Sequence, residues 1–64
     1  MTLERALAIL GVEPTADRAA LDAAFRRRSR ACHPDKVAHL DPEFTALARR
    51  KFEELRRAYE LLTG

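Results

Sequence analysis

The stretch Ala31-Cys32-His33-Pro34-Asp35-Lys36 decides the fold because it separates two long helical patterns. Pro34 ends the first of them, since the residue before a proline is pushed away from helical backbone dihedrals. The same stretch places an imidazole at His33 and a carboxylate at Asp35, on either side of the proline. It therefore joins a break between helices to two polar side chains suited to recognition.

The segment before this break predicts a helix over residues 16–32. We expect Thr15 to cap its start, with Asp17 in the first turn near the positive end of the helix dipole. Arg28 falls on the apolar stripe, where its stem can cover the edge of the core while the guanidinium reaches solvent. The alternative is that this face is more exposed than the pattern indicates. The other residues of the stripe are Leu21, Ala24, Phe25 and Cys32.

The segment after the break predicts a second long helix over residues 42–62. Asp41 is the expected N-cap, Pro42 occupies the first helical position, and Glu43 adds an acid in the first turn. The apolar residues recur at three- and four-residue spacing through Phe44, Leu47, Ala48, Phe52, Leu55, Ala58, Tyr59 and Leu62. We expect the aromatic residues of both helices to lie in the core, namely Phe25, Phe44, Phe52 and Tyr59.

A short helix is predicted over residues 2–10, with Thr2 as N-cap and Gly11 just past its end. Val12 should pack against the core, and the apolar stripe consists of Leu3, Ala6, Leu7 and Leu10. Two helices of similar length joined by a short connection should lie antiparallel with their stripes facing. We therefore expect one all-α domain over residues 1–64, in which the short helix covers a long helical hairpin and the loop 33–41 forms its solvent-exposed tip.

Size and composition favour a binding module over an enzyme. A chain of 64 residues buries only about 60% of its unfolded surface, which leaves little room for a substrate cavity beside a core. The net charge of +2 is modest, but Ala23 to His33 holds four arginines and no acid. A single cysteine cannot form an internal disulfide, which fits a reducing, cytoplasmic setting. No apolar run approaches the roughly 20 residues that span a bilayer, and no signal peptide opens the chain.

Four residues around the break are of types that bind metals, namely Cys32, His33, Asp35 and His39. They lack the second close pair that marks a structural zinc site, and Pro34 limits how the neighbouring side chains converge. We therefore expect no metal and no cofactor. Cys32 is interpreted as a small packed residue.

These patterns together resemble the J-domain of DnaJ-type (heat-shock-40) co-chaperones. The resemblance runs from Ala6 to Thr63, in order and with the family's spacing. Residues 40–51 are similar to the DjlA or TerB-associated branch, in which the J-domain ends a longer protein. The family's usual fourth helix has no counterpart. The blocks that carry the resemblance are Ile9-Leu10-Gly11-Val12, Ala24-Phe25-Arg26-Arg27, His33-Pro34-Asp35-Lys36, Lys51-Phe52, Leu55, Ala58-Tyr59-Glu60 and Leu61-Leu62.

The resemblance implies a module that docks on a DnaK-type (heat-shock-70) chaperone, stimulates its ATP hydrolysis and couples that hydrolysis to client binding. The chain itself would not be an enzyme. His33, Pro34 and Asp35 would be the essential triad, and a basic surface would meet an acidic face of the ATPase. The expected partner-binding residues are His33, Pro34, Asp35, Lys36, Arg26, Arg27 and Arg30.

The chain departs from the family pattern at several positions. Ala6-Leu7 stands where tyrosines are usual, Arg28 replaces a leucine and Ala31 replaces a frequent basic residue. Cys32 stands where the family often has an aromatic residue. The change at Ala6-Leu7 bears on packing more than on docking. The changes at Arg28 and Ala31 redistribute charge on the second helix and bear on which chaperone is preferred and how strongly, rather than on whether one binds.

Two other functions compete with this interpretation. A small basic helical domain could bind nucleic acid through the arginine cluster of its second helix, although the modest net charge and the acids of the third helix argue against it. A degenerate J-like scaffold could bind another protein without activating an ATPase, against which the complete triad argues. We expect a monomer, alone or as part of a longer protein, that contacts neither nucleic acid nor membrane through this segment. It would lie in the cytoplasm or on the cytoplasmic side of a membrane.

Overall fold

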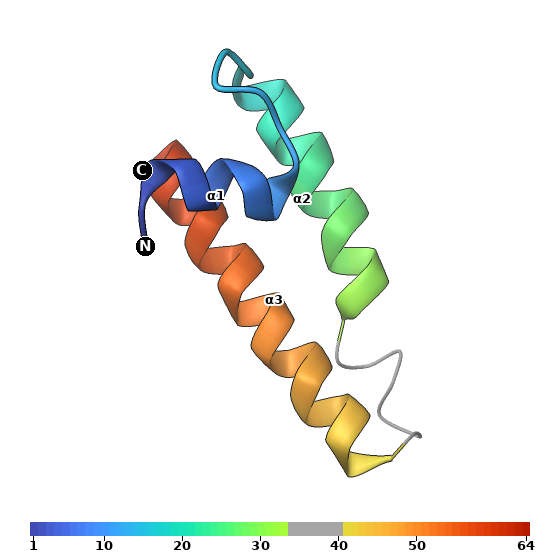
Figure 1. Ribbon diagram of the computed structural model, residues 1–64. Helices are drawn as coiled ribbons and strands as arrows, with labels where there is room; N and C mark the ends of the chain where they lie inside the picture. The colour runs from blue at the N-terminus through green and yellow to red at the C-terminus, as the bar shows by residue number, and fades with distance from the viewer. Residues whose placement is uncertain (34–40) are drawn as a thin grey trace.

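The computed structural model describes residues 1–33 and 41–64, which form three helices and no strand (Figure 1). They are α1 (Leu3–Leu10), α2 (Arg18–Cys32) and α3 (Pro42–Thr63). The expected all-α fold is confirmed. The two long helices differ in length more than expected, because α2 has 15 residues and α3 has 22.

Each helix begins at a side-chain cap. The Thr2 hydroxyl accepts a hydrogen bond from the backbone N–H of Arg5 at 3.1 Å, and Asp41 Oδ1 accepts one from Glu43 at 2.8 Å. Both caps were predicted. The prediction for α2 was wrong, because Asp17 caps this helix through the backbone N–H of Ala20 at 2.8 Å.

Thr15 does not cap α2 because it belongs to the preceding turn. The backbone N–H of Ala16 donates to the carbonyl of Glu13 at 3.0 Å, which makes Pro14 and Thr15 the two central residues of a β-turn. Proline favours the first of these central positions because its ring fixes φ. The helix can therefore begin only after the turn is complete.

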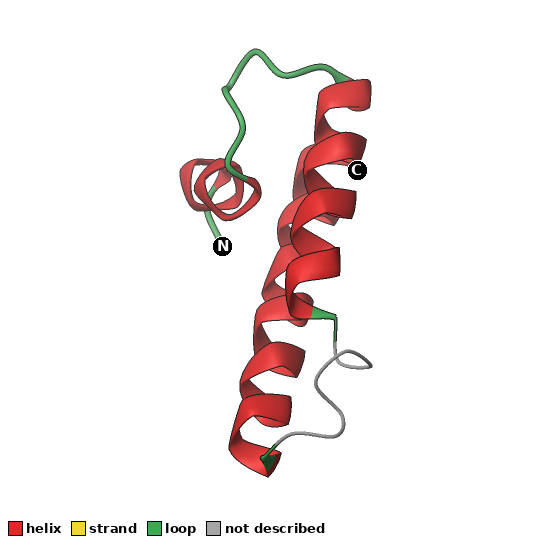
Figure 2. Cartoon of the chain, turned by 90° about the vertical axis from the view of Figure 1, so that its right-hand side faces the viewer, coloured by secondary structure: helices red, strands yellow, loops and turns green. Residues whose placement is uncertain are grey.

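The long helices α2 and α3 run antiparallel, side by side (Figures 1 and 2). The short helix α1 crosses the C-terminal half of α3 and packs mainly against it (Figure 1). The core lies where the three helices meet, and Leu10 is its largest fully buried side chain. Val12 packs against this core as predicted. The core residues are Ala6, Leu10, Leu21, Ala24, Leu55 and Ala58.

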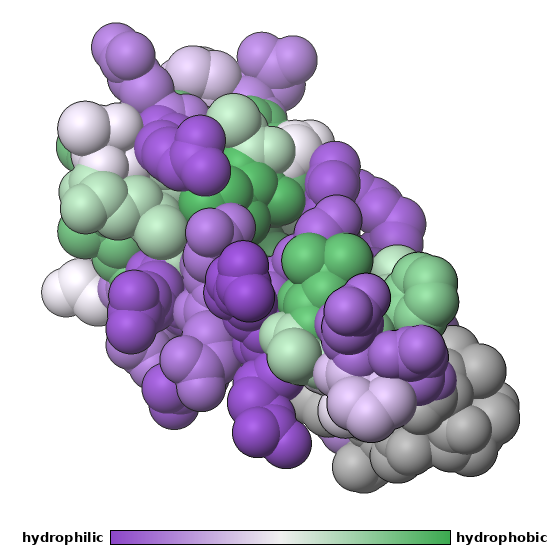
Figure 3. Space-filling model, turned by 60° about the horizontal axis from the view of Figure 1, so that its bottom comes forward, coloured by the Kyte–Doolittle hydropathy of each residue, from purple (hydrophilic) through white to green (hydrophobic). Residues whose placement is uncertain are grey.

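Three residues predicted to face the core are exposed instead. The exposed fractions are 59% for Leu3, 59% for Phe44 and 43% for Leu47. The end of α2 lies level with Phe52, so the first two turns of α3 extend beyond it, and no other described helix covers Phe44 or Leu47. Leu3 stands at the first position of α1, at the edge of the molecule. Apolar patches between polar side chains are visible on the face in Figure 3.

Candidate partner-binding site

His33 directly follows the last residue of α2 and is the C-cap of that helix. Its backbone is extended, with φ −65° and ψ 129°, and the residue is half-buried. The imidazole packs with its edge against Phe52 of α3, with ring centroids 5.4 Å apart and planes inclined by 71°. The predicted site residues Pro34, Asp35 and Lys36 lie outside the described residues.

The contact between His33 and Phe52 is the end of a row of rings along the α2–α3 interface. Phe52 lies 6.4 Å from Phe25, and Phe25 lies 4.7 Å from Tyr59, centroid to centroid. The rings are tilted, as the quadrupoles of aromatic pairs favour. Phe25, Phe52 and Tyr59 are half-buried rather than fully buried, so they reach the surface of the hairpin. The row connects the position of His33 to the packing of the two long helices.

A polar network closes the far end of this row. The Tyr59 hydroxyl donates to Asp22 Oδ1 at 2.5 Å, and Arg18 Nε donates to the same oxygen at 3.1 Å. Arg18 Nη2 also donates to the Tyr59 hydroxyl at 3.2 Å, and its guanidinium lies 5.6 Å from the centre of that ring. The Tyr59 hydroxyl first, and then Arg18, hold the pKa of Asp22 below its usual value. The network therefore joins α2 to α3 opposite the loop end.

Sequence reasoning missed this network. The four-residue spacing of Arg18 and Asp22 was a signal for a helical ion pair. Tyr59 lies 37 residues from Asp22 along the chain, and only the register of the two helices brings them together. That register does not follow from the apolar periodicity alone.

The predicted basic residues Arg26, Arg27 and Arg30 are all exposed on α2. Arg26 and Arg30 are four residues apart and share a face of the helix. In the part of the chain that the structure describes, the ion pair recorded is Arg18–Asp22, and none involves these three arginines. Arg26 lies one helical turn from Asp22 and helps to lower the pKa of that carboxyl, so the described part of the surface beside His33 is basic but includes one nearby acid.

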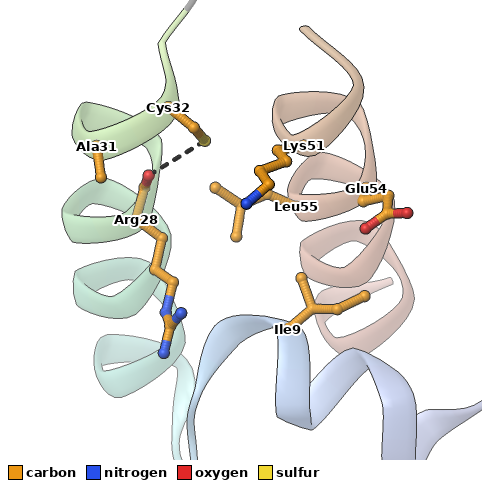
Figure 4. Close-up of a pocket in the computed structure, with 7 residues that line it drawn as sticks. All are labelled: Ile9, Arg28, Ala31, Cys32, Lys51, Glu54 and Leu55. Atoms are coloured by element: carbon orange, nitrogen blue, oxygen red, sulfur yellow. Dashed lines mark hydrogen bonds between the residues drawn. The ribbon is translucent and has the colours of Figure 1, made fainter. Parts of the chain in front are cut away.

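Each of the two alternatives considered for Arg28, a stem that covers the core edge or a more exposed face, is met only in part. The residue is exposed, but its guanidinium is placed directly against Gly11 at the end of α1. It borders a groove of about 380 Å³ between the three helices (Figure 4). The groove was not predicted. The signal that could have indicated it was Arg28, a charged residue on the apolar stripe that faces the other helices. Its lining residues are Ile9, Arg28, Ala31, Cys32, Lys51, Glu54 and Leu55.

Two negative findings apply to the described residues. Residues 1–33 and 41–64 contain no group of three or more potential ligands that could hold a metal ion, whereas Asp35 and His39 fall outside them. None of the helices α1 to α3 is both long enough and apolar enough to cross a bilayer.

Comparison with known proteins identifies relatives along almost the whole chain. The co-chaperone protein DjlA of Escherichia coli strain K12 is 41% identical over 63 residues, which cover 95% of this chain and 23% of that protein. DjlA of Salmonella typhimurium strain LT2 is 40% identical over the same extent. The curved DNA-binding protein of Pseudomonas putida strain W619 is 48% identical over 54 residues, or 84% of this chain and 15% of that protein.

The chain thus spans less than a quarter of the length of these relatives. No solved structure gives a significant match. The family model for the DnaJ domain matches residues 6–64, which is most of the chain. Three helices with His33 at the end of α2 agree with that match, and the chain belongs to the DnaJ domain family.

Proposed function

We propose that this chain docks on a DnaK-type (heat-shock-70) chaperone, stimulates its ATP hydrolysis and so couples hydrolysis to client binding. The observation that carries the proposal is the position of His33 directly after a helix with three exposed arginines, none of which forms an ion pair with another residue of 1–33 or 41–64. Family membership supports a DnaK-type partner in general. The activity would take place in the cytoplasm or on the cytoplasmic side of a membrane.

Each proposed contact has a physical basis. Arg26, Arg27 and Arg30, together with Lys36, raise the encounter rate with an acidic surface and orient it. Asp35 can pair with an arginine of the chaperone in a charge-assisted hydrogen bond. Neutral His33 can donate and accept hydrogen bonds at the same time.

The direct experiment is single-turnover ATP hydrolysis by a DnaK-type chaperone with and without the chain. His33→Gln or Asp35→Asn should abolish stimulation and leave the helical circular dichroism unchanged. The matched control is Arg57→Gln, a polar substitution on the exposed part of α3, which should stimulate normally. Near-normal stimulation by either loop variant would show that the triad does not have the proposed role.

The basic surface needs a separate experiment. Charge reversal at Arg26 and Arg27 should weaken docking and reduce its dependence on salt, because fewer screened attractions remain. Charge reversal at the adjacent pair Arg56 and Arg57 changes the net charge equally on another helix and is the control. Equal affinities for the two double variants would show that α2 has no special part in docking.

A nucleic-acid-binding function is the main alternative. The name of the Pseudomonas relative refers to DNA, but the match covers 15% of that protein and does not connect its DNA binding with the shared segment. A duplex-DNA mobility shift at physiological ionic strength should show no binding by this chain. Binding to the chaperone without stimulation would instead favour a degenerate scaffold.

A further inference from the structure

The groove between the three helices has an apolar floor and two basic walls. Ile9 of α1, Ala31 of α2 and Leu55 of α3 supply the apolar surface. Figure 4 shows Lys51 extending from α3 toward α2 above Leu55, while Arg28 runs along the opposite wall toward α1. The groove is therefore accessible from solvent between two cationic side chains.

Neither of these cations has an anionic partner among the described residues. Glu54 lines the groove, yet its carboxylate forms no ion pair with Lys51 and points away from it in Figure 4. A ligand with an apolar group and an adjacent carboxylate would match both features. The apolar group would cover Leu55 and Ile9, and the carboxylate would form a charge-assisted pair with Lys51 or Arg28.

The groove is continuous with the surface proposed for chaperone docking. Ala31 lies one helical turn after Arg27 on the same face of α2, and Cys32 directly precedes His33. A partner that covers Arg27 and His33 therefore also reaches the edge of the groove. An acidic partner would be attracted by Lys51 and Arg28 as it is by the arginines of α2.

We propose that this groove is a second contact for the DnaK-type chaperone. It takes a segment of the chaperone in which an apolar side chain adjoins an aspartate or glutamate. This inference rests on the proposed function, and it specifies the kind of chaperone segment that the chain would recognise. Cys32 leaves the space open, because a larger side chain at that position would fill it.

The charge requirement is tested by comparing Lys51→Gln with Arg50→Gln. Each removes one positive charge from neighbouring exposed positions of α3, but only Lys51 lines the groove. Lys51→Gln should weaken chaperone affinity by roughly threefold to tenfold, as for a partly exposed charged pair, and Arg50→Gln by less than about twofold. Equal effects of the two substitutions would overturn the proposal.

The shape requirement is tested by Cys32→Tyr, which places a large ring in the groove. The melting temperature should stay the same or rise, because apolar surface is covered, while chaperone affinity should fall by a similar factor. Unchanged affinity in a folded Cys32→Tyr variant would show that the chaperone does not enter the groove.

The two proposals fail in distinguishable ways. If the unmodified chain neither binds nor stimulates the chaperone, both are refuted. If it stimulates normally and the groove variants bind like the unmodified chain, only the groove contact is refuted. Binding should also shift the backbone amide resonances of Ile9 and Leu55 in a nitrogen-15-labelled chain, and unshifted resonances at both would contradict entry into the groove.

Discussion

Replacing Gly11 with alanine should destabilise the protein through two separable effects. Gly11 ends α1 in the left-handed conformation, with φ 70° and ψ 40°, where its N–H donates to the carbonyls of Leu7 and Ala8. A side chain disfavours this conformation. A Cβ at Gly11 would also collide with Nη2 of Arg28 and lie 3.1 Å from its Cζ, so the guanidinium would have to move.

The conformational effect costs about 1–2 kcal/mol, because the Cβ approaches the following carbonyl in the left-handed region. The movement of Arg28 costs about 0.3–1 kcal/mol, the usual value of a cation near a helix C-terminus. α1 has no basic residue in its own last turn, so Arg28 supplies that charge from α2. A total near 2 kcal/mol is a large part of the roughly 3–10 kcal/mol that stabilises a domain of this size. The melting temperature should fall by about 8–16 °C.

The assay is a double-mutant cycle with Gly11→Ala, Arg28→Ala and the combination, measured by urea unfolding and circular dichroism. Arg28→Ala alone should cost about 0.3–1 kcal/mol. The combination should cost less than the sum, because Gly11→Ala already displaces Arg28. Additivity within about 0.3 kcal/mol would refute the contact between Arg28 and the end of α1. A cost below about 0.5 kcal/mol for Gly11→Ala would refute the conformational argument.

Three further predictions concern the capping of α2, the carboxylate network and the ring of His33. Asp17→Ala should destabilise the protein by about 1 kcal/mol and Thr15→Ala by much less in urea unfolding, and equal costs would contradict the assigned cap. Because the pKa of Asp22 is lowered in the folded state, its contribution is present above the ordinary carboxyl pKa of about 3.9 and is lost as pH falls through the lowered value. Asp22→Asn should therefore flatten the pH dependence of thermal melts in acid, and an unchanged profile would contradict this. Phe52→Leu should move the His33 ring-proton resonances toward their unfolded positions, and unmoved resonances would show that the ring contact is absent in solution.

The helical pattern of the sequence was sufficient to predict three helices and the antiparallel arrangement of the two long ones. Periodic apolar residues, Pro34 and Gly11 define where helices run and stop. The pattern failed at Phe44 and Leu47, because periodicity identifies a face of a helix and not how far the neighbouring helix extends. It failed at Thr15 because a turn competed with the cap for the same residue.

The candidate site was predictable only in part, for a related reason. Exposed arginines on α2 follow from a run of four arginines without an acid. The contact of His33 with Phe52 and the network around Asp22 depend on the relative register of α2 and α3. Register is decided by side-chain packing between helices, which a single sequence does not display.

The row of rings between α2 and α3 also gives the protein a natural optical reporter. The chain has one tyrosine and no tryptophan, and phenylalanine emits only weakly, so Tyr59 dominates its near-ultraviolet emission. The hydroxyl of that ring donates to the carboxylate of Asp22. A carboxylate that can accept the phenolic proton in the excited state quenches tyrosine emission. Separation of α2 from α3 should therefore increase the fluorescence of Tyr59. Opening of the hairpin could then be followed in unlabelled samples by fluorescence alone.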